Sequence, residues 1–276
     1  ERNKRSLRLE ELGEKIAERE QKEMWDSQVN KKTEYLKEPF VDGHLIISDR
    51  RIELEEVIFS GTAKYVNERI HYFNNKSSEY PIFLVIDSCY GGSVMEGAKI
   101  LEAMKSSRAP VYVVVKALAA SMAAVITSLS DRSFAYPNAI IVHHQMMSFM
   151  FGNRTQIEEE LEMGKEWTRR VMQPVADKMG IAMDEFVEKM YSNNSSGNWY
   201  EFGDNATKIK WVDTIVKDIR DTSFDHQPVD IKEDNNEIFI FAKEEKIDSQ
   251  GNRYVKLPNL APLDVYYLYN PHNYFR

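Results

Sequence analysis

The chain has 276 residues, of which 42% are hydrophobic and 29% charged, and its formal net charge is -8. This composition is typical of a soluble globular chain and excludes fibrous, collagen-like and wholly disordered classes. Because the acidic balance offers no basic surface for phosphates, we expect no nucleic-acid partner.

Cys89 is the single cysteine, which excludes an intramolecular disulfide and a cysteine-rich zinc site. Redox and structural-zinc roles are thereby excluded, and we expect no metal and no cofactor. No apolar run approaches the roughly 20 residues that span a bilayer, and we expect a cytoplasmic protein. The sequence starts at Glu1 rather than Met, which suggests that it is processed or trimmed and that a targeting segment would be invisible in it.

The charge and apolar patterns divide the chain into three parts. Residues 1–38 carry ten Lys or Arg and ten Asp or Glu, which predicts a charged helical arm. Residues 39–225 alternate short β-branched runs with helical stretches, the pattern of an α/β domain with crossover connections. Residues 226–276 form a C-terminal extension with a strand-like run at 237–242, which predicts a small β element or a wrapping tail.

Within the central domain, the runs at 81–86 and 110–115 are continuously apolar, as expected of parallel strands covered on both faces. A glycine turn and a helix separate them. The very apolar segment 121–129 predicts a buried helix. Apolar positions at helical spacing after Thr155 predict one long amphipathic helix that ends at Gly180 and serves as an arm or an interface.

Three candidate functional features follow predicted strands, where open α/β sheets bind ligands. They are Gly91-Gly92, Ser121 and His144. A serine hydroxyl becomes a nucleophile when an imidazole takes its proton, and the resulting oxyanion needs backbone N–H donors such as those of Gly92 and Met122. Taken singly, these features also fit a turn, a helix N-cap and a structural histidine, so the residues alone leave the function open.

Four short motifs resemble the proteolytic subunit of the Clp protease, a serine peptidase of the ClpP/crotonase superfamily. The resemblance covers about residues 55–217, and its motifs are Gly91-Gly-Ser-Val94, Ala119-Ala-Ser-Met122, Tyr136-Pro-Asn138 and His144-Gln145. It implies an α/β fold, a ClpP/crotonase-like spiral of ββα units with a protruding long helix. It also implies a serine-type endopeptidase that cleaves peptides or unfolded proteins as a homo-oligomer of stacked heptameric rings, with an AAA+ unfoldase as partner.

Carried over by position, the resemblance makes Ser121 the nucleophile that forms the acyl-enzyme and His144 the base. It assigns the oxyanion hole to the amides of Gly92 and Met122. The adjacent His143 falls where the family has an apolar residue, and alternation along a strand would send the two imidazoles to opposite faces. We therefore expect His144 alone to meet Ser121.

The third member of the family's triad, an Asp, falls on Asn198 in this sequence. Counting without gaps gives Asn193 instead, and Asp204 is a nearby carboxylate that could replace either. An Asn can orient an imidazole but cannot stabilise its charged form, and replacing the Asp of a serine triad costs on the order of 10⁴ in turnover when the wrong tautomer results. We therefore expect reduced activity.

Three alternatives remain open. The first is a catalytically impaired Clp-like subunit with a structural or regulatory role. The second is a signal-peptide-peptidase-like enzyme with a Ser/Lys dyad that uses Lys165 or Lys178. The third and least favoured is a crotonase-type acyl-CoA enzyme. Metal catalysis has no support, because neighbouring histidines lack the i, i+4 spacing that places two ligands on one helix face.

Overall fold

The computed structural model describes residues 12–22, 35–146, 152–192, 194–223, 245–260 and 264–276. Residues 12–22 lie in a helix. The other helices are α2 (Thr62–Lys76), α3 (Val94–Ser106), α4 (Met122–Leu129), α5 (Arg154–Val171), α6 (Gln173–Met179), α7 (Met183–Ser192) and α8 (Gly203–Lys208). The strands are β1 (Phe40–Val41), β2 (His44–Ile47), β3 (Arg51–Glu53), β4 (Glu56–Ile58), β5 (Ile82–Ser93), β6 (Val111–Ala120), β7 (Arg132–Ala135), β8 (Ile140–His143), β9 (Trp199–Phe202), β10 (Thr214–Ile215), β11 (Asp218–Asp221), β12 (Glu245–Ile247), β13 (Arg253–Val255) and β14 (Tyr266–Leu268).

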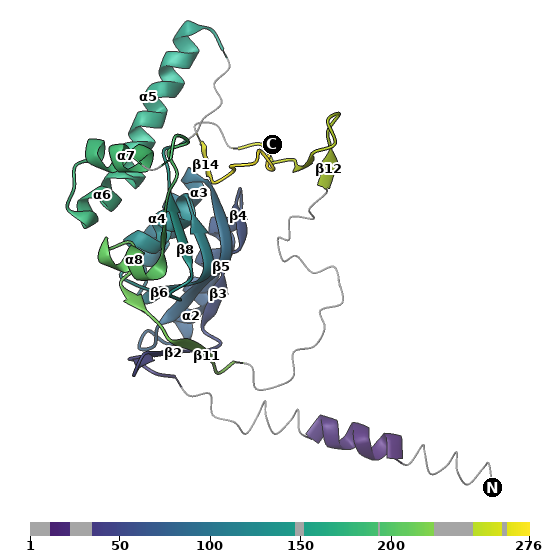
Figure 1. Ribbon diagram of the computed structural model, residues 1–276. Coiled ribbons are helices and arrows are strands. Elements are labelled where there is room, and N and C mark those ends of the chain that lie inside the picture. The colour runs from purple at the N-terminus through teal and green to yellow at the C-terminus, as the bar shows by residue number, and fades with distance from the viewer. Residues whose placement is uncertain (1–11, 23–34, 147–151, 193, 224–244, 261–263) are drawn as a thin grey trace.

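A mixed sheet of nine strands is the centre of the molecule, and its interior is parallel (Figure 1). Strands β3 and β4 pair with one side of β5, and β6 pairs with the other side, all in parallel. Strand β6 pairs with β7 along its first half and with β8 along its second half. Mixed α/β content with a parallel sheet is therefore confirmed.

Alternation along β5 divides the core between the two faces of the sheet. Ile82, Leu84 and Ile86 join the larger apolar cluster, whereas Phe83 and Val85 join the smaller one. Because side chains alternate along a strand, a continuous apolar run is stable only where both faces are covered. Both predicted buried strands are present, and both extend further toward their carboxyl ends than the apolar runs indicated.

The predicted helix from Thr155 to Gly180 is wrong as a single element. It consists of α5 and α6, which are separated at Met172, and Pro174 lies in the first turn of α6. Proline lacks the N–H that would continue the ladder of α5, but it is tolerated where a helix begins. Helix α5 extends away from the sheet, while α6 and α7 lie beside its base (Figure 1).

The C-terminal extension contributes to two sheets. Strands β12 and β13 form a hairpin, and β14 joins the main sheet by pairing antiparallel with β5. The strand-like run at 237–242 lies outside the described residues. The division of the chain at residues 38 and 225 stays a prediction.

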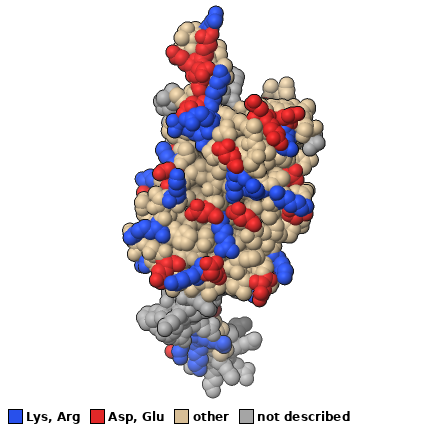
Figure 2. Space-filling model, turned by 90° about the vertical axis from the view of Figure 1, so that its left-hand side faces the viewer, with Lys and Arg blue, Asp and Glu red and all other residues tan. Residues whose placement is uncertain are grey.

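Charged side chains of both signs are interspersed over the face of the molecule shown in Figure 2. They do not gather there into a patch of one sign. In the described part of the chain, no helix combines the length and the apolar character needed to cross a bilayer.

Candidate active site

The pairing of β6 with β8 brings Ser121 and His144 together. Ala120 at the end of β6 lies opposite Val142 of β8, and Ser121 donates its backbone N–H to the Val142 carbonyl at 2.8 Å. Each functional residue follows within two positions of this pair. Because the strands are parallel, both chain segments leave the sheet at the same edge.

Ser121 has a strained backbone at the start of α4. Its φ of 62° and ψ of -121° are unusual for a residue with a side chain. Such a conformation costs on the order of 1–3 kcal/mol and persists where the surroundings impose it, most often at functional sites. Helix α4 is buried along nearly all of its length, so its packing holds this turn in place.

The Ser121 hydroxyl is within hydrogen-bond distance of the imidazole, with Oγ 2.6 Å from His144 Nε2. Both residues are buried, at 0% and 3% exposure. Burial lowers the pKa of His144 to about 4, against a smaller raising effect of its hydrogen bond to the Gln145 carbonyl. The ring is therefore neutral at pH 7 and able to accept a proton.

The other imidazole nitrogen, Nδ1, lies 2.6 Å from the backbone carbonyl oxygen of Gln145. An oxygen acceptor there requires the proton on Nδ1 and leaves Nε2 free to accept from the serine. Asn198 does not occupy this position, because its amide nitrogen donates to Ser196 Oγ at 2.7 Å. The Asp204 carboxylate accepts the Asn205 amide at 2.9 Å, and Asn193 lies outside the described residues. In this structure, a neutral backbone carbonyl thus stands where a serine triad has a carboxylate.

His143 belongs to a second buried Ser–His pair on a different side of β8. Its Nε2 lies 3.1 Å from Ser128 Oγ, and its ring packs against Trp211 and Phe186. Burial, reinforced by the neighbouring His144, lowers the pKa of His143 to about 3. The two imidazoles contact different serines, as strand alternation predicts.

The two expected oxyanion donors flank Ser121. Gly92 lies at the end of β5 with a φ of 149°, and a Cβ there would collide with the backbone carbonyl of Ile58 on β4. Met122 is the first residue of α4, where backbone N–H groups have no partner within the helix. A Cβ at Gly91 would lie 2.7 Å from both the Met122 nitrogen and the Ser121 Cβ, so the glycine turn passes directly beside the nucleophile.

Neither lysine of the Ser/Lys alternative contacts Ser121 in the structure. Lys178 Nζ donates to the Ser128 carbonyl at 2.7 Å and pairs with Asp213 at 3.0 Å. Lys165 pairs with Glu162 at 2.7 Å on the exposed surface of α5.

Two groups that contact His144 were not anticipated from the sequence. The Gln145 carbonyl is a backbone group, so no residue type could have marked it. Tyr267 of β14 packs its ring against His144 with 4.8 Å between centroids and donates its hydroxyl to the His144 carbonyl. The abundance of tyrosines in the last 51 residues was the only signal for it.

A buried serine on a strained turn, a neutral histidine within hydrogen-bond reach and an adjacent glycine turn are the groups that acyl transfer through a serine requires. The family model described as Clp protease matches residues 40–218, and the chain belongs to this family.

Two curated relatives are similar to parts of the chain. The ATP-dependent Clp protease proteolytic subunit 1 of Protochlamydia amoebophila is 32% identical over 119 residues, which cover 42% of this chain and 57% of the relative. The ATP-dependent Clp protease proteolytic subunit of Ligilactobacillus salivarius is 29% identical over 137 residues, which cover 49% of this chain and 69% of the relative.

Proposed function

We propose that this protein is a Clp-like serine endopeptidase in which Ser121 is the nucleophile and His144 the base. The observation that carries the proposal is the distance of 2.6 Å between Ser121 Oγ and Nε2 of a neutral, buried imidazole. The amides of Gly92 and Met122 complete the site as the oxyanion hole.

The reaction proceeds by acyl transfer. Ser121 Oγ attacks the peptide carbonyl carbon while its proton moves to His144 Nε2. The carbonyl oxygen becomes an oxyanion that accepts hydrogen bonds from the two backbone N–H groups. The C–N bond then breaks, and the leaving amine takes the proton from Nε2. Water adds to the ester with the same base, which releases a carboxylic acid and regenerates the hydroxyl.

The neutral partner on Nδ1 sets the expected rate. The Gln145 carbonyl holds the productive tautomer, as the Asp of a triad does, but it supplies no charge to stabilise the imidazolium formed during attack. We therefore expect slow turnover with an intact nucleophile.

The quaternary arrangement is part of the proposal. We expect the spiral of ββα units and the stacked heptameric rings that the family resemblance implies, with α5 as the contact between rings. The exposed Ile157 and Leu161 on this protruding helix support that role, because a thin apolar stripe on an amphipathic helix suits a protein contact. We expect an AAA+ unfoldase as partner because of the family and because the two relatives are named ATP-dependent.

A subunit that assembles without cleaving is the second candidate. The lack of a carboxylate in the described contacts of His144 favours it. It predicts the same rings with no reaction at Ser121.

An alkyl fluorophosphonate probe tests the proposal, because it forms a covalent adduct only with an activated serine. We expect labelling of the wild-type chain on Ser121 and none of Ser121→Ala. The matched control is Ser128→Ala, which removes the other buried serine that contacts a histidine, and it should retain labelling. Equal labelling of wild type and Ser121→Ala would contradict the proposed chemistry. Intact rings that neither take up the probe nor hydrolyse peptides would favour the second candidate.

A further inference from the structure

Strand β14 lies along the segment of β5 that contains the expected oxyanion donor. Its register places Tyr266 opposite Ser93, Tyr267 opposite Gly92 and Leu268 opposite Gly91. At the two ends of this pairing, Val94 donates its N–H to Val265 at 3.0 Å and Tyr269 donates to Tyr90 at 2.8 Å.

This pattern directs the Gly92 amide toward Tyr267. Hydrogen-bonded and non-hydrogen-bonded pairs alternate along an antiparallel ladder, and the bonded pairs at positions 94 and 90 flank position 92. Gly92 and Tyr267 are therefore a bonded pair, in which the Gly92 N–H faces the Tyr267 carbonyl.

The Tyr267 carbonyl oxygen also lies close to the nucleophile. The place where a Cβ of Gly91 would stand is 2.5 Å from this oxygen and 2.7 Å from both the Met122 nitrogen and the Ser121 Cβ. These atoms thus converge within a few ångströms. A carbonyl oxygen that faces the Gly92 amide and lies near the Met122 amide and Ser121 is close to the position of a substrate's attacked carbonyl.

The tyrosine side chain fills the adjoining space. It is fully buried, its ring packs on His144, and its hydroxyl donates to the His144 carbonyl. A substrate residue whose carbonyl entered the oxyanion hole would need the same volume for its side chain.

A peptide and β14 cannot occupy the site together. On the opposite edge of β5, Gly92 already lies beside Ile58 of β4. An extended peptide that accepts the Gly92 amide must therefore add to the edge that β14 holds, which is the mode of strand addition to an exposed sheet edge.

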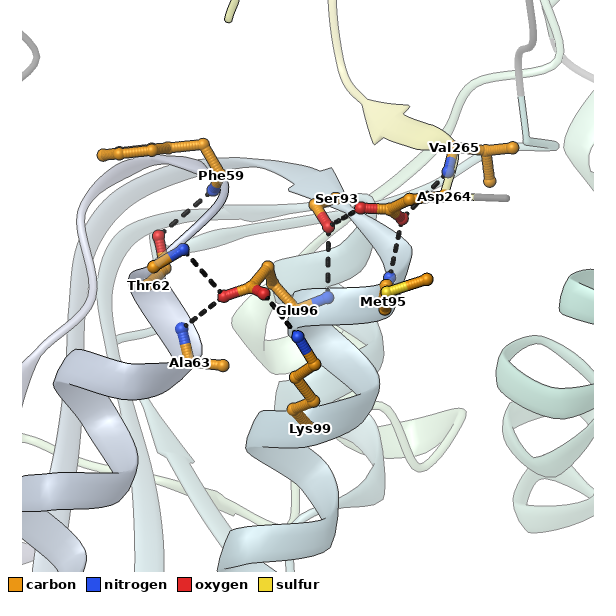
Figure 3. Close-up of polar contacts among 10 residues, drawn as sticks. Phe59, Thr62, Ala63, Ser93, Met95, Glu96, Lys99, Asp264 and Val265 are labelled. Carbon is orange, nitrogen blue, oxygen red and sulfur yellow. Dashed lines mark hydrogen bonds and ion pairs between the residues drawn. The ribbon is translucent and has the colours of Figure 1, made fainter. Parts of the chain in front are cut away.

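Asp264 anchors the start of β14 at the N-terminus of α3 (Figure 3). Its carboxylate accepts the Met95 amide at 2.9 Å and the Val265 amide at 2.8 Å, and Ser93 donates its hydroxyl to the same group. A carboxylate at a helix N-terminus is favoured by the unpaired amides and the helix dipole. This anchor joins the tail to the helix that follows the glycine turn.

We propose that β14 is an internal pseudo-substrate that occupies the peptide-binding cleft, with Tyr267 in the pocket for the residue whose carbonyl Ser121 attacks. The proposal rests on the serine peptidase function above and deepens it in two ways. It names the substrate class as extended peptides with an aromatic residue at that position. It also makes release of residues 264–269 the step that opens the site.

The test uses full-length chains that differ in one carboxylate. Asp264→Asn removes the charge that anchors β14. The control Asp248→Asn alters a tail carboxylate that accepts hydrogen bonds from Gln250, Asn252 and Arg276. We expect Asp264→Asn to react with the fluorophosphonate about tenfold faster than wild type, because loss of the charge-assisted hydrogen bonds weakens the anchor of β14. Asp248→Asn should react at the wild-type rate.

Two further measurements complete the test. Hydrogen exchange at the Gly92 amide, which needs no catalysis, should be faster in Asp264→Asn and in Tyr269→Pro, which removes the bond to Tyr90. A synthetic peptide of residues 264–270 should slow the labelling of Asp264→Asn, and the same peptide with alanine at position 267 should not. Unchanged exchange and unchanged labelling in both variants would overturn the proposal. Faster exchange with no labelling of any variant would support the position of β14 on Gly92 but refute the peptidase function.

Discussion

Acid should destabilise this protein through its two adjacent buried histidines. Burial lowers the pKa of His143 to about 3 and that of His144 to about 4, from an ordinary value of 6.5. In the unfolded chain both rings take up a proton as the pH falls through 6.5, while in the folded chain both stay neutral. Stability is therefore lost as the pH falls below 6.5, and the loss continues until the folded-state pKa is reached.

The magnitude follows from the separation of the pKa values. Between pH 7 and pH 5, each histidine contributes a loss of about 2 kcal/mol, and the pair a loss of roughly 4 kcal/mol. Small proteins have unfolding free energies of about 5–15 kcal/mol, so the effect is a large share of the total.

His143→Leu separates the contribution of one ring. His143 Nδ1 makes no hydrogen bond with any described residue, and its neighbours Trp211 and Phe186 are aromatic, so a leucine of similar size suits the space. Urea unfolding at pH 7 and pH 5 should show that the variant loses about 2 kcal/mol less than wild type on acidification. The control His71→Leu alters an exposed imidazole on α2 and should behave as wild type. An equal loss in His143→Leu and wild type would refute the reasoning.

Two further predictions concern the site itself. Gly92→Ala should lower the rate of fluorophosphonate labelling by about 100-fold and cost about 2 kcal/mol in urea unfolding, because the new Cβ meets the Ile58 carbonyl and displaces an oxyanion donor. In the control Gly164→Ala in α5, a Cβ meets nothing within 4 Å. This variant should keep the labelling rate, and its free energy of unfolding should rise by about 0.5–1 kcal/mol. Similar behaviour of the two variants would contradict the assignment of Gly92 as an oxyanion donor. The labelling rate should also change by less than about twofold between pH 7 and pH 5, because His144 stays neutral, whereas a base with the ordinary pKa would lose about 25-fold.

The sheet and the Ser–His juxtaposition were accessible from local sequence. Continuous β-branched runs have a physical cause, since only strands covered on both faces tolerate them. Parallel strands present their carboxyl ends at one edge of a sheet, so the sequence alone predicts that Ser121 and His144, which each follow a strand, lie close together.

The remaining features depend on interactions that the local sequence does not reveal. The apolar spacing continues through the break between α5 and α6, so periodicity predicted one helix. Pro174 is compatible with a helix only in its first turn, and the sequence did not show that a helix begins there. The partner of His144 Nδ1 is a backbone carbonyl, which every residue possesses. A match to a family motif pointed to a side chain, Asn198, that bonds elsewhere in this structure.

The position of β14 follows from the unequal lengths of β5 and β6. Pairing between them ends at Cys89 and Ala119, because the chain turns at Ser121 into α4. Residues 91–93 of β5 therefore extend past their neighbour and leave one edge without a partner. Buried amides on such an edge need an acceptor. An active site that binds peptides by strand addition requires this open edge, so the same residues need a cover whenever no peptide is bound. Residues 266–268 of the same chain supply that cover. The open edge that a peptidase site needs for its substrate is thus the same edge that β14 closes.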